Sequence, residues 1–231
     1  MLDFNQFEAL SFDCYGTLID WEHGITSILE KIVSDHQIDC DEQQLLKLFS
    51  EYEPIAQSGK YQNYKDVLRE VVQKIGERLE FEPTISELES LWKSIETWKT
   101  FSDTVEALQA LKQKYRLVII SNIDDDLFAQ TAQQLQVEFD DVITAQQVKS
   151  YKPAQRNFEF ALEKIGLSPD KVLHVAQSLY HDIAPAKQFG LTTVWVNRQQ
   201  GKEGTGATQP TAAEPDLEVP DLKTLVSLIN S

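Results

Sequence analysis

Cysteine is scarce in this sequence, and long apolar runs are absent. The 231 residues contain two cysteines, Cys14 and Cys40, and so few thiols are typical of a reducing compartment rather than an exported disulfide scaffold. No stretch approaches the roughly 18 consecutive apolar residues of a transmembrane helix. Residues 1–10 lack the basic region with which a signal peptide begins. We therefore expect a cytoplasmic protein that does not insert into a membrane.

Positive charge is also in short supply. The chain has 37 Asp and Glu residues against 21 Lys and Arg residues, a formal net charge of −16. Nucleic acids and anionic membrane surfaces are bound through clustered basic residues, so neither partner is expected. There is no CxxC, HExxH or Walker motif, and the four histidines lack zinc-ligand spacing. We expect no metal and no cofactor, and an enzyme for anions would have to find its positive charge locally.

The hydrophobic pattern divides the chain into a helical block and an alternating block. Residues 8–13 form a short apolar strand that ends at the turn Gly16-Thr17. The spacing then predicts four consecutive helices, over 24–36, 41–57, 63–79 and 85–97. After Trp98, strands are predicted at 117–120, 141–144, 172–176 and 192–196. Asp103 and Glu106 form a plausible capping box for a helix that continues to residue 115. Further helices are predicted over 125–135, 153–168, 182–189 and 221–229.

Apolar strands that alternate with helices predict an α/β fold with a parallel sheet covered by helices on both faces. The all-helical block follows the first strand and can lie over the sheet edge as a lid. We assign residues 1–20 and 99–231 to the α/β core and residues 21–98 to a helical cap subdomain. The Gly-, Thr- and Pro-rich stretch 199–215 is predicted to be a flexible loop.

Polar residues follow the predicted strands. Active sites of parallel sheets lie beyond the carboxyl ends of the strands, so the informative positions are Asp13, Ser121-Asn122, Lys152 and the segment 177–182. Taken singly, each has a plainer explanation as a turn residue, a helix cap or a solvated charge. Their shared position at one edge of the sheet favours a functional site.

These positions resemble the four motifs of the haloacid dehalogenase superfamily. The run FDCYGTLID, residues 12–20, resembles the first motif, Ser121-Asn122 the second, Lys152-Pro153 the third and residues 177–182 the fourth. The resemblance implies a Rossmann-like core with an inserted helical cap. It also implies that Asp13 is a carboxylate nucleophile and that Thr17 donates a hydrogen bond in the site. Lys152 would keep Asp13 ionised, while Asp182 would orient Lys152 and a hydrolytic water.

Two substitutions separate the sequence from the magnesium-dependent phosphatases of this superfamily. Tyr15 stands where those enzymes carry a second Asp, and Gln177 where they carry a metal-binding Asp. The DxYGT form instead resembles the type II 2-haloacid dehalogenases, which use no metal. The resemblance implies that Asp13 attacks C2 of a small 2-substituted carboxylic acid and forms an aspartyl ester. Water would then hydrolyse this ester and release a 2-hydroxy acid.

The substrate contacts depart from the dehalogenase pattern. No Arg occurs between Asp13 and Arg69, where those enzymes carry a cap Arg, and Phe158 replaces a motif Tyr. The runs 12–22, 121–124, 137–140 and 150–153 resemble a branch that includes azetidine-2-carboxylate hydrolase, in which a ring nitrogen leaves C2 instead of a halide. The substrate-binding candidates are Tyr15, Trp21, Ser121, Asn122, Ser178 and Tyr180.

Two other functions remain open from the sequence. One is a magnesium-dependent small-metabolite phosphatase, and the other is a non-catalytic binding protein that keeps the fold. The expected partner is a small carboxylic acid, and the resemblance makes a homodimer possible. Three further features are interpreted as structural: Cys14 as a buried filler, His174 as a packed core histidine, and Asp124 to Asp126 as a helix N-terminus favoured by the helix dipole.

Overall fold

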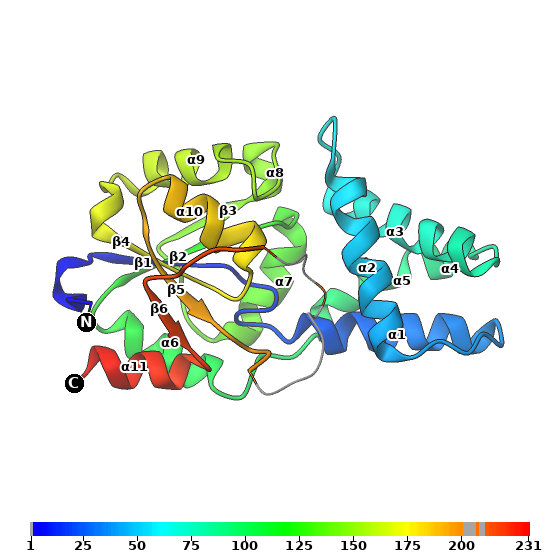
Figure 1. Cartoon of the computed structure of the whole chain (residues 1–231), viewed down its shortest axis with the longest axis horizontal. Coiled ribbons are helices and arrows are strands. Elements are labelled where there is room, and N and C mark those ends of the chain that lie inside the picture. The colour runs from blue at the N-terminus through cyan, green and yellow to red at the C-terminus, as the bar shows by residue number, and fades with distance from the viewer. Residues whose placement is uncertain (1, 201–206, 208–210) are drawn as a thin grey trace.

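A parallel sheet forms the centre of the protein (Figure 1). The computed structural model describes residues 2–200, 207 and 211–231, and within them six strands pair in parallel in the order β3-β2-β1-β4-β5-β6. The strands are β1 (Ala9–Phe12), β2 (Arg116–Ser121), β3 (Asp141–Thr144), β4 (Val172–Ala176), β5 (Thr192–Val196) and β6 (Leu217–Val219). The predicted α/β fold class is thereby confirmed.

Helices cover both faces of the sheet, which explains why its central strands are apolar throughout. Buried side chains of α9, such as Phe158, pack with Val118 and Ile120 of β2 on one face. Side chains of α6, α7 and α11 pack on the other face with Leu117 and Ile119. The helices that accompany the sheet, on both faces together, are α6 (Thr104–Lys112), α7 (Asp125–Leu135), α8 (Ala145–Val148), α9 (Arg156–Ile165), α10 (Ala184–Gln188) and α11 (Leu222–Ile229).

The helices that follow β1 lie together at one end of the molecule, on the right in Figure 1. They are α1 (Trp21–Asp35), α2 (Glu42–Gln57), α3 (Tyr64–Leu79), α4 (Ile85–Leu88) and α5 (Ser90–Ser94), with the 3-10 turn η2 (Ile95–Thr97). The predicted helix 85–97 is therefore broken into three short pieces. Helix α1 begins three residues before the predicted start, because the Asp20 carboxylate accepts a hydrogen bond from the His23 N–H. The domain boundaries at 20/21 and 98/99 stay a prediction.

Several predicted helix ends are wrong. Asp103 makes no side-chain cap of α6, because Arg198 binds its carboxylate at 2.9 Å and the Leu222 N–H donates to it at 2.6 Å. Helix α6 ends at Lys112 rather than at residue 115. Helix α9 spans 156–165 instead of 153–168.

The predicted helix 182–189 begins at a different residue in the structure, and the predicted loop 199–215 is described only in part. The predicted helix 182–189 begins earlier, as the π-helical turn η4 (Leu179–Ile183), because the Ser178 hydroxyl caps the His181 N–H. Within the predicted loop 199–215, residues 201–206 and 208–210 lie outside the described residues. Strand β6 and the 3-10 turns η1 (Phe4–Gln6) and η3 (Pro169–Lys171) are additional elements. No helix in the described part of the chain is long and apolar enough to cross a membrane.

Candidate active site

The turn after β1 fixes the position of the Asp13 carboxylate. Gly16 adopts a φ of +97°, and a Cβ atom there would lie 2.8 Å from the indole nitrogen of Trp21, so glycine suits both the turn and the close approach. The Thr17 hydroxyl donates to Asp13 Oδ2 at 2.8 Å and itself accepts from the Gln177 N–H at 2.9 Å. The hydroxyl is thus oriented by its own partner, and it holds Asp13 in one rotamer.

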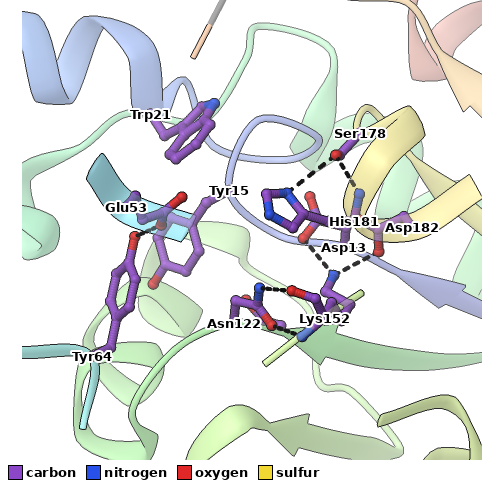
Figure 2. Close-up of a pocket in the computed structure, with 11 residues that line it drawn as sticks. Asp13, Tyr15, Trp21, Glu53, Tyr64, Asn122, Lys152, Ser178, His181 and Asp182 are labelled. Carbon is purple, nitrogen blue, oxygen red and sulfur yellow. Dashed lines mark hydrogen bonds and ion pairs between the residues drawn. The ribbon is translucent and has the colours of Figure 1, made fainter. Parts of the chain in front are cut away.

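Lys152 joins the two catalytic candidates Asp13 and Asp182 (Figure 2). Its Nζ donates to Asp13 Oδ1 at 2.9 Å, to Asp182 Oδ1 at 2.6 Å and to the Ile120 carbonyl at 2.8 Å. An ammonium group has three protons, so these bonds use all of its donors. Its side chain is 1% exposed. All three protons of the ammonium are therefore bound to residues of the core, and none is left for another partner.

Burial and charge act in opposite directions on these groups. Burial raises the pKa of the Asp13 carboxyl, and the nearby Lys152 ammonium counters only part of that rise. Burial alone would raise the pKa of Asp182 too, but Lys152 and His174 reverse the effect and hold it below its usual value. The pKa of Lys152 is raised, because the two carboxylates outweigh its own burial. The arrangement stabilises a protonated Lys152 between two carboxylates.

His174 is a buried histidine, as predicted, but it also has a polar role that the sequence analysis missed. Its Nε2 lies 3.0 Å from Asp182 Oδ1, and its Nδ1 lies 2.9 Å from the Ser11 hydroxyl. Because an ionised carboxylate only accepts hydrogen bonds, we assign the ring proton to Nε2. Ser11 then donates to Nδ1, and the chain Ser11–His174–Asp182 orients the carboxylate.

The second motif contributes one structural amide and one free hydroxyl. The Asn122 amide donates to the Lys152 carbonyl at 3.0 Å and accepts from the Lys152 N–H at 2.7 Å. Asn122 therefore fastens the segment that carries Lys152, although it also lines the pocket. The Ser121 hydroxyl is buried and has no hydrogen-bond partner among the described residues. It is the group of this pair that is left available to a ligand.

Aromatic rings form the wall of the pocket opposite Lys152. Tyr15 lines it with its ring, while its hydroxyl is hydrogen-bonded to Thr131 at 2.8 Å. Trp21 and Ser178 line the pocket as well. Tyr180 does not belong to the lining, and its ring packs against the ring of His181 with the centroids 4.9 Å apart. The structure thus does not bring Tyr180 to the site with the other candidates.

Two lining residues, Glu53 and Tyr64, lie outside every predicted site segment, and a third, His181, lies within the predicted segment 177–182 without being a candidate itself. Glu53 of α2 is buried, and its Oε1 accepts a hydrogen bond from the Tyr64 hydroxyl of α3 at 2.7 Å. Burial is the main cause that raises the pKa of Glu53 to about 7. The hydrogen bond from Tyr64 lowers this pKa, and the negative charge of Asp13 raises it. Burial lowers the pKa of His181 to about 4, so its ring is neutral near pH 7.

The pocket lies between the core and the cap helices and encloses about 400 Å³, part of which is open to solvent. Core residues such as Asp13 and cap residues such as Glu53 face the same space. Among the described residues, no three His, Cys, Asp or Glu side chains are grouped in the way that a metal ion would require. The arrangement presents the buried Asp13 carboxylate to a pocket that can receive a small molecule.

Comparisons with known proteins show which proteins this chain resembles. A family model described as haloacid dehalogenase-like hydrolase matches residues 7–190. Haloacetate dehalogenase H-2 of Moraxella sp. (strain B) is 26% identical over 97% of this chain and 98% of its own. An (S)-2-haloacid dehalogenase of Pseudomonas fluorescens is 28% identical over 82% and 84%.

A solved structure has the same fold. The L-2-haloacid dehalogenase of Xanthobacter autotrophicus superimposes with a TM-score of 0.81 at 24% identity, over 97% of this chain and 99% of its own. A second structure of that enzyme carries chloropropionic acid covalently bound, with a TM-score of 0.79 at 22% identity and the same coverage.

Proposed function

The chain belongs to the haloacid dehalogenase-like hydrolase family, and we propose that this hydrolase uses Asp13 to substitute at C2 of a small 2-substituted carboxylic acid. The observation that carries the proposal is the Asp13 carboxylate, which is buried at a strand end with both oxygens held. A relative of the same fold carries chloropropionic acid covalently bound, which supports a covalent route here.

Substitution would proceed in two steps. A lone pair of an Asp13 oxygen forms a bond to C2 while the bond from C2 to the leaving group breaks, and the leaving group departs with the bonding electrons. Burial strips water from the carboxylate, which makes it a better nucleophile. Lys152, at 2.9 Å, favours the ionised form of Asp13 in the free enzyme and then faces the carbonyl oxygen of the ester. The product of this step is an ester between Asp13 and the acid.

Hydrolysis of the ester needs a water at the Asp13 carbonyl carbon. Asp182 Oδ2 is buried and has no hydrogen-bond partner within the described chain, so it can accept a proton from that water. The Ser11–His174 pair holds the other oxygen and thus the orientation of the carboxylate. Lys152 stabilises the negative charge that develops on the tetrahedral intermediate. Water oxygen enters Asp13, and a 2-hydroxy acid leaves.

The residues around Asp13 favour chemistry without a metal. Mg²⁺ prefers several oxygen ligands, with charged carboxylates among them. Tyr15 is neutral and bonded to Thr131, and Gln177 carries an amide, at the two positions where the phosphatases carry carboxylates. Both carboxylates that remain, Asp13 and Asp182, already bind Lys152. A phosphoryl dianion would add negative charge to a site with one ammonium.

The leaving group is the finer part of the proposal. We favour a nitrogen, as in the ring opening of azetidine-2-carboxylate at its C2–N bond, over a halide. The cap places the carboxylate Glu53 in the pocket, and no Arg stands between Asp13 and Arg69. A substrate that carries its own positive nitrogen suits such a pocket better than a simple anion does.

Turnover in water labelled with oxygen-18 tests the covalent route. With enzyme in excess over azetidine-2-carboxylate or 2-chloropropionate, and with EDTA present, the peptide that contains Asp13 should gain the label. Asp13→Asn should abolish turnover, whereas Asp3→Asn, which alters an exposed carboxylate that does not line the pocket, should leave the labelling intact. Label that enters the 2-hydroxy acid but never Asp13 would refute the ester, and a rate lost to EDTA would refute the absence of a metal.

A further inference from the structure

Glu53 has the surroundings of a ligand-binding group rather than those of a structural carboxylate. It is 4% exposed and continues the buried face of α2 that Leu45, Phe49 and Ala56 form. Its hydrogen-bond partner is Tyr64, and no Lys, Arg or His of the described residues forms an ion pair with it. Buried carboxylates are normally paired with a cation. The pocket therefore contains an acid that lacks its counter-charge.

Lys152 does not fill that role. It is the one Lys or Arg among the residues that line the pocket, and Asp13, Asp182 and the Ile120 carbonyl use its three protons. The hydroxyl of Tyr64 compensates only in part, because burial still raises the pKa of Glu53 to about 7. A positive group that could compensate Glu53 has to arrive with the ligand.

The opposite side of the pocket offers hydrogen-bond donors instead. The Ser121 hydroxyl and His181 Nε2 are both buried and have no partner in the described structure. The Ser178 hydroxyl accepts from the His181 N–H and lies 3.3 Å from His181 Nδ1, to which it can donate. The ring proton is then on Nε2, as a donor. Two donors on the core side and a carboxylate on the cap side suit a ligand with one negative and one positive end.

We propose that the Glu53 carboxylate binds the positively charged nitrogen of a zwitterionic substrate and so keeps that nitrogen protonated until the C2–N bond breaks. Ser121 and His181 would bind the substrate carboxylate. This inference rests on the proposed substitution at C2 and names the residue that selects its substrate class, a cyclic or open-chain 2-amino acid whose nitrogen is the leaving group.

The step balances within the pocket. An Asp13 oxygen forms its bond to C2, and the electron pair of the C2–N bond passes to the nitrogen. The substrate nitrogen, positive before the step, becomes a neutral amine. This amine keeps all of its protons and needs none from Glu53, because the Glu53 carboxylate has kept the nitrogen protonated up to the moment at which the bond breaks. A neutral amine leaves far more readily than the amide anion that an unprotonated nitrogen would form.

Binding to an inactive enzyme tests this role without requiring turnover. In an Asp13→Asn background, azetidine-2-carboxylate is compared with cyclobutanecarboxylate, which has the same ring size but no nitrogen. We expect the zwitterion to bind more tightly, and Glu53→Gln to reduce this preference by about 100-fold, the effect of removing one partner of a buried charge pair. Glu51→Gln is the matched control, because Glu51 is exposed on the same helix.

Each outcome separates this inference from the proposed function. A preference that survives Glu53→Gln, that falls equally with Glu51→Gln, or that is absent at the start would overturn the role of Glu53. If the preference depends on Glu53 but Asp13 never takes up oxygen-18, the binding role stands and the ester route fails. With active enzyme, the ratio of kcat/KM for azetidine-2-carboxylate over 2-chloropropionate should also fall by about 100-fold in Glu53→Gln.

Discussion

Ionisation of Glu53 destabilises the folded protein, because the charged carboxylate is buried. Its pKa rises from the usual 4.5 to about 7 in the folded protein, so the folded state holds this proton more tightly than the unfolded chain does. The stabilisation is complete below pH 4.5 and is lost as the pH rises through 7. The titratable and charged groups around it are Tyr64 of α3, Asp13 beyond β1, and the neighbours Tyr151 and Lys152.

Glu53→Gln should therefore change the pH dependence of stability. Relative to the wild type, the free energy of unfolding of the variant should rise between pH 4.5 and pH 8 by up to about 3 kcal/mol, because glutamine has no charge to bury. Chemical denaturation at a series of pH values measures this difference, in which the titration of the other groups largely cancels. Glu51→Gln, which changes an exposed carboxylate on the same helix, is measured as the control. A difference for Glu53→Gln that does not change with pH would show that its carboxylate is not desolvated.

The sequence could predict those site residues that stand at strand ends. Asp13 follows β1, Ser121 ends β2, and Lys152 follows β3 after the short helix α8. A parallel sheet brings the carboxyl ends of its strands to one edge. Glu53 belongs to no motif, and its place opposite Asp13 depends on how the cap packs on the core. One signal existed in the sequence: Glu53 lies four residues after Phe49, in register with a stripe that begins at Leu45. A carboxylate on an apolar stripe indicates a buried acid.

Helix α3 depends on the core for the cap of its first turn. Its own N-cap residue, Asn63, makes no side-chain capping bond. Instead the Asp124 carboxylate, at the start of α7, accepts from the N–H groups of Tyr64 at 3.0 Å and Lys65 at 3.1 Å. The sequence predicts Asp124 only as part of the N-terminus of its own helix. The bond ties the helix that carries Tyr64 to the core.

Asp124→Ala should weaken this tie. We expect a loss of about 1–2 kcal/mol of stability, as for other N-cap deletions, and a higher KM, because Tyr64 orients Glu53. Thermal unfolding and steady-state kinetics measure the two effects. Asp126→Ala is the matched control in the same turn, since it removes an ion pair between Lys65 and an exposed carboxylate and should cost about 0.5 kcal/mol. Equal effects of the two substitutions would contradict the role of Asp124.

Pattern strength decided which elements the sequence could predict. Strands β3, β4 and β5 and helix α7 have the predicted bounds, because each is a continuous apolar run or an amphipathic stretch with clear ends. Strand β6 was missed because three residues, Leu217–Val219, carry too short a pattern. The early start of η4 depends on the Ser178 hydroxyl, a local bond that hydrophobic periodicity does not report.

Negative charge dominates the whole molecule and the pocket alike. The chain carries a formal net charge of −16, and the pocket is lined by Asp13, Glu53 and Asp182 against the single ammonium of Lys152. An incoming monoanion meets repulsion at both scales, whereas a zwitterion has no net charge for the long-range field to act on. The excess of carboxylates over ammonium groups in the pocket, rather than the net charge of the chain, argues for a substrate with a positive group.

Ionic strength should therefore separate the two ligand classes. In Asp13→Asn protein, the association constant of cyclobutanecarboxylate should rise by about two- to five-fold between 10 and 200 mM NaCl, because the screening length falls from about 30 Å to less than 10 Å. The association constant of azetidine-2-carboxylate should change much less, because the field acts on its two ends with opposite sign. Titration calorimetry at several salt concentrations measures both. If salt changes the association constants of both ligands by the same factor, short-range contacts rather than the electrostatic field of the protein decide which acids bind in the pocket.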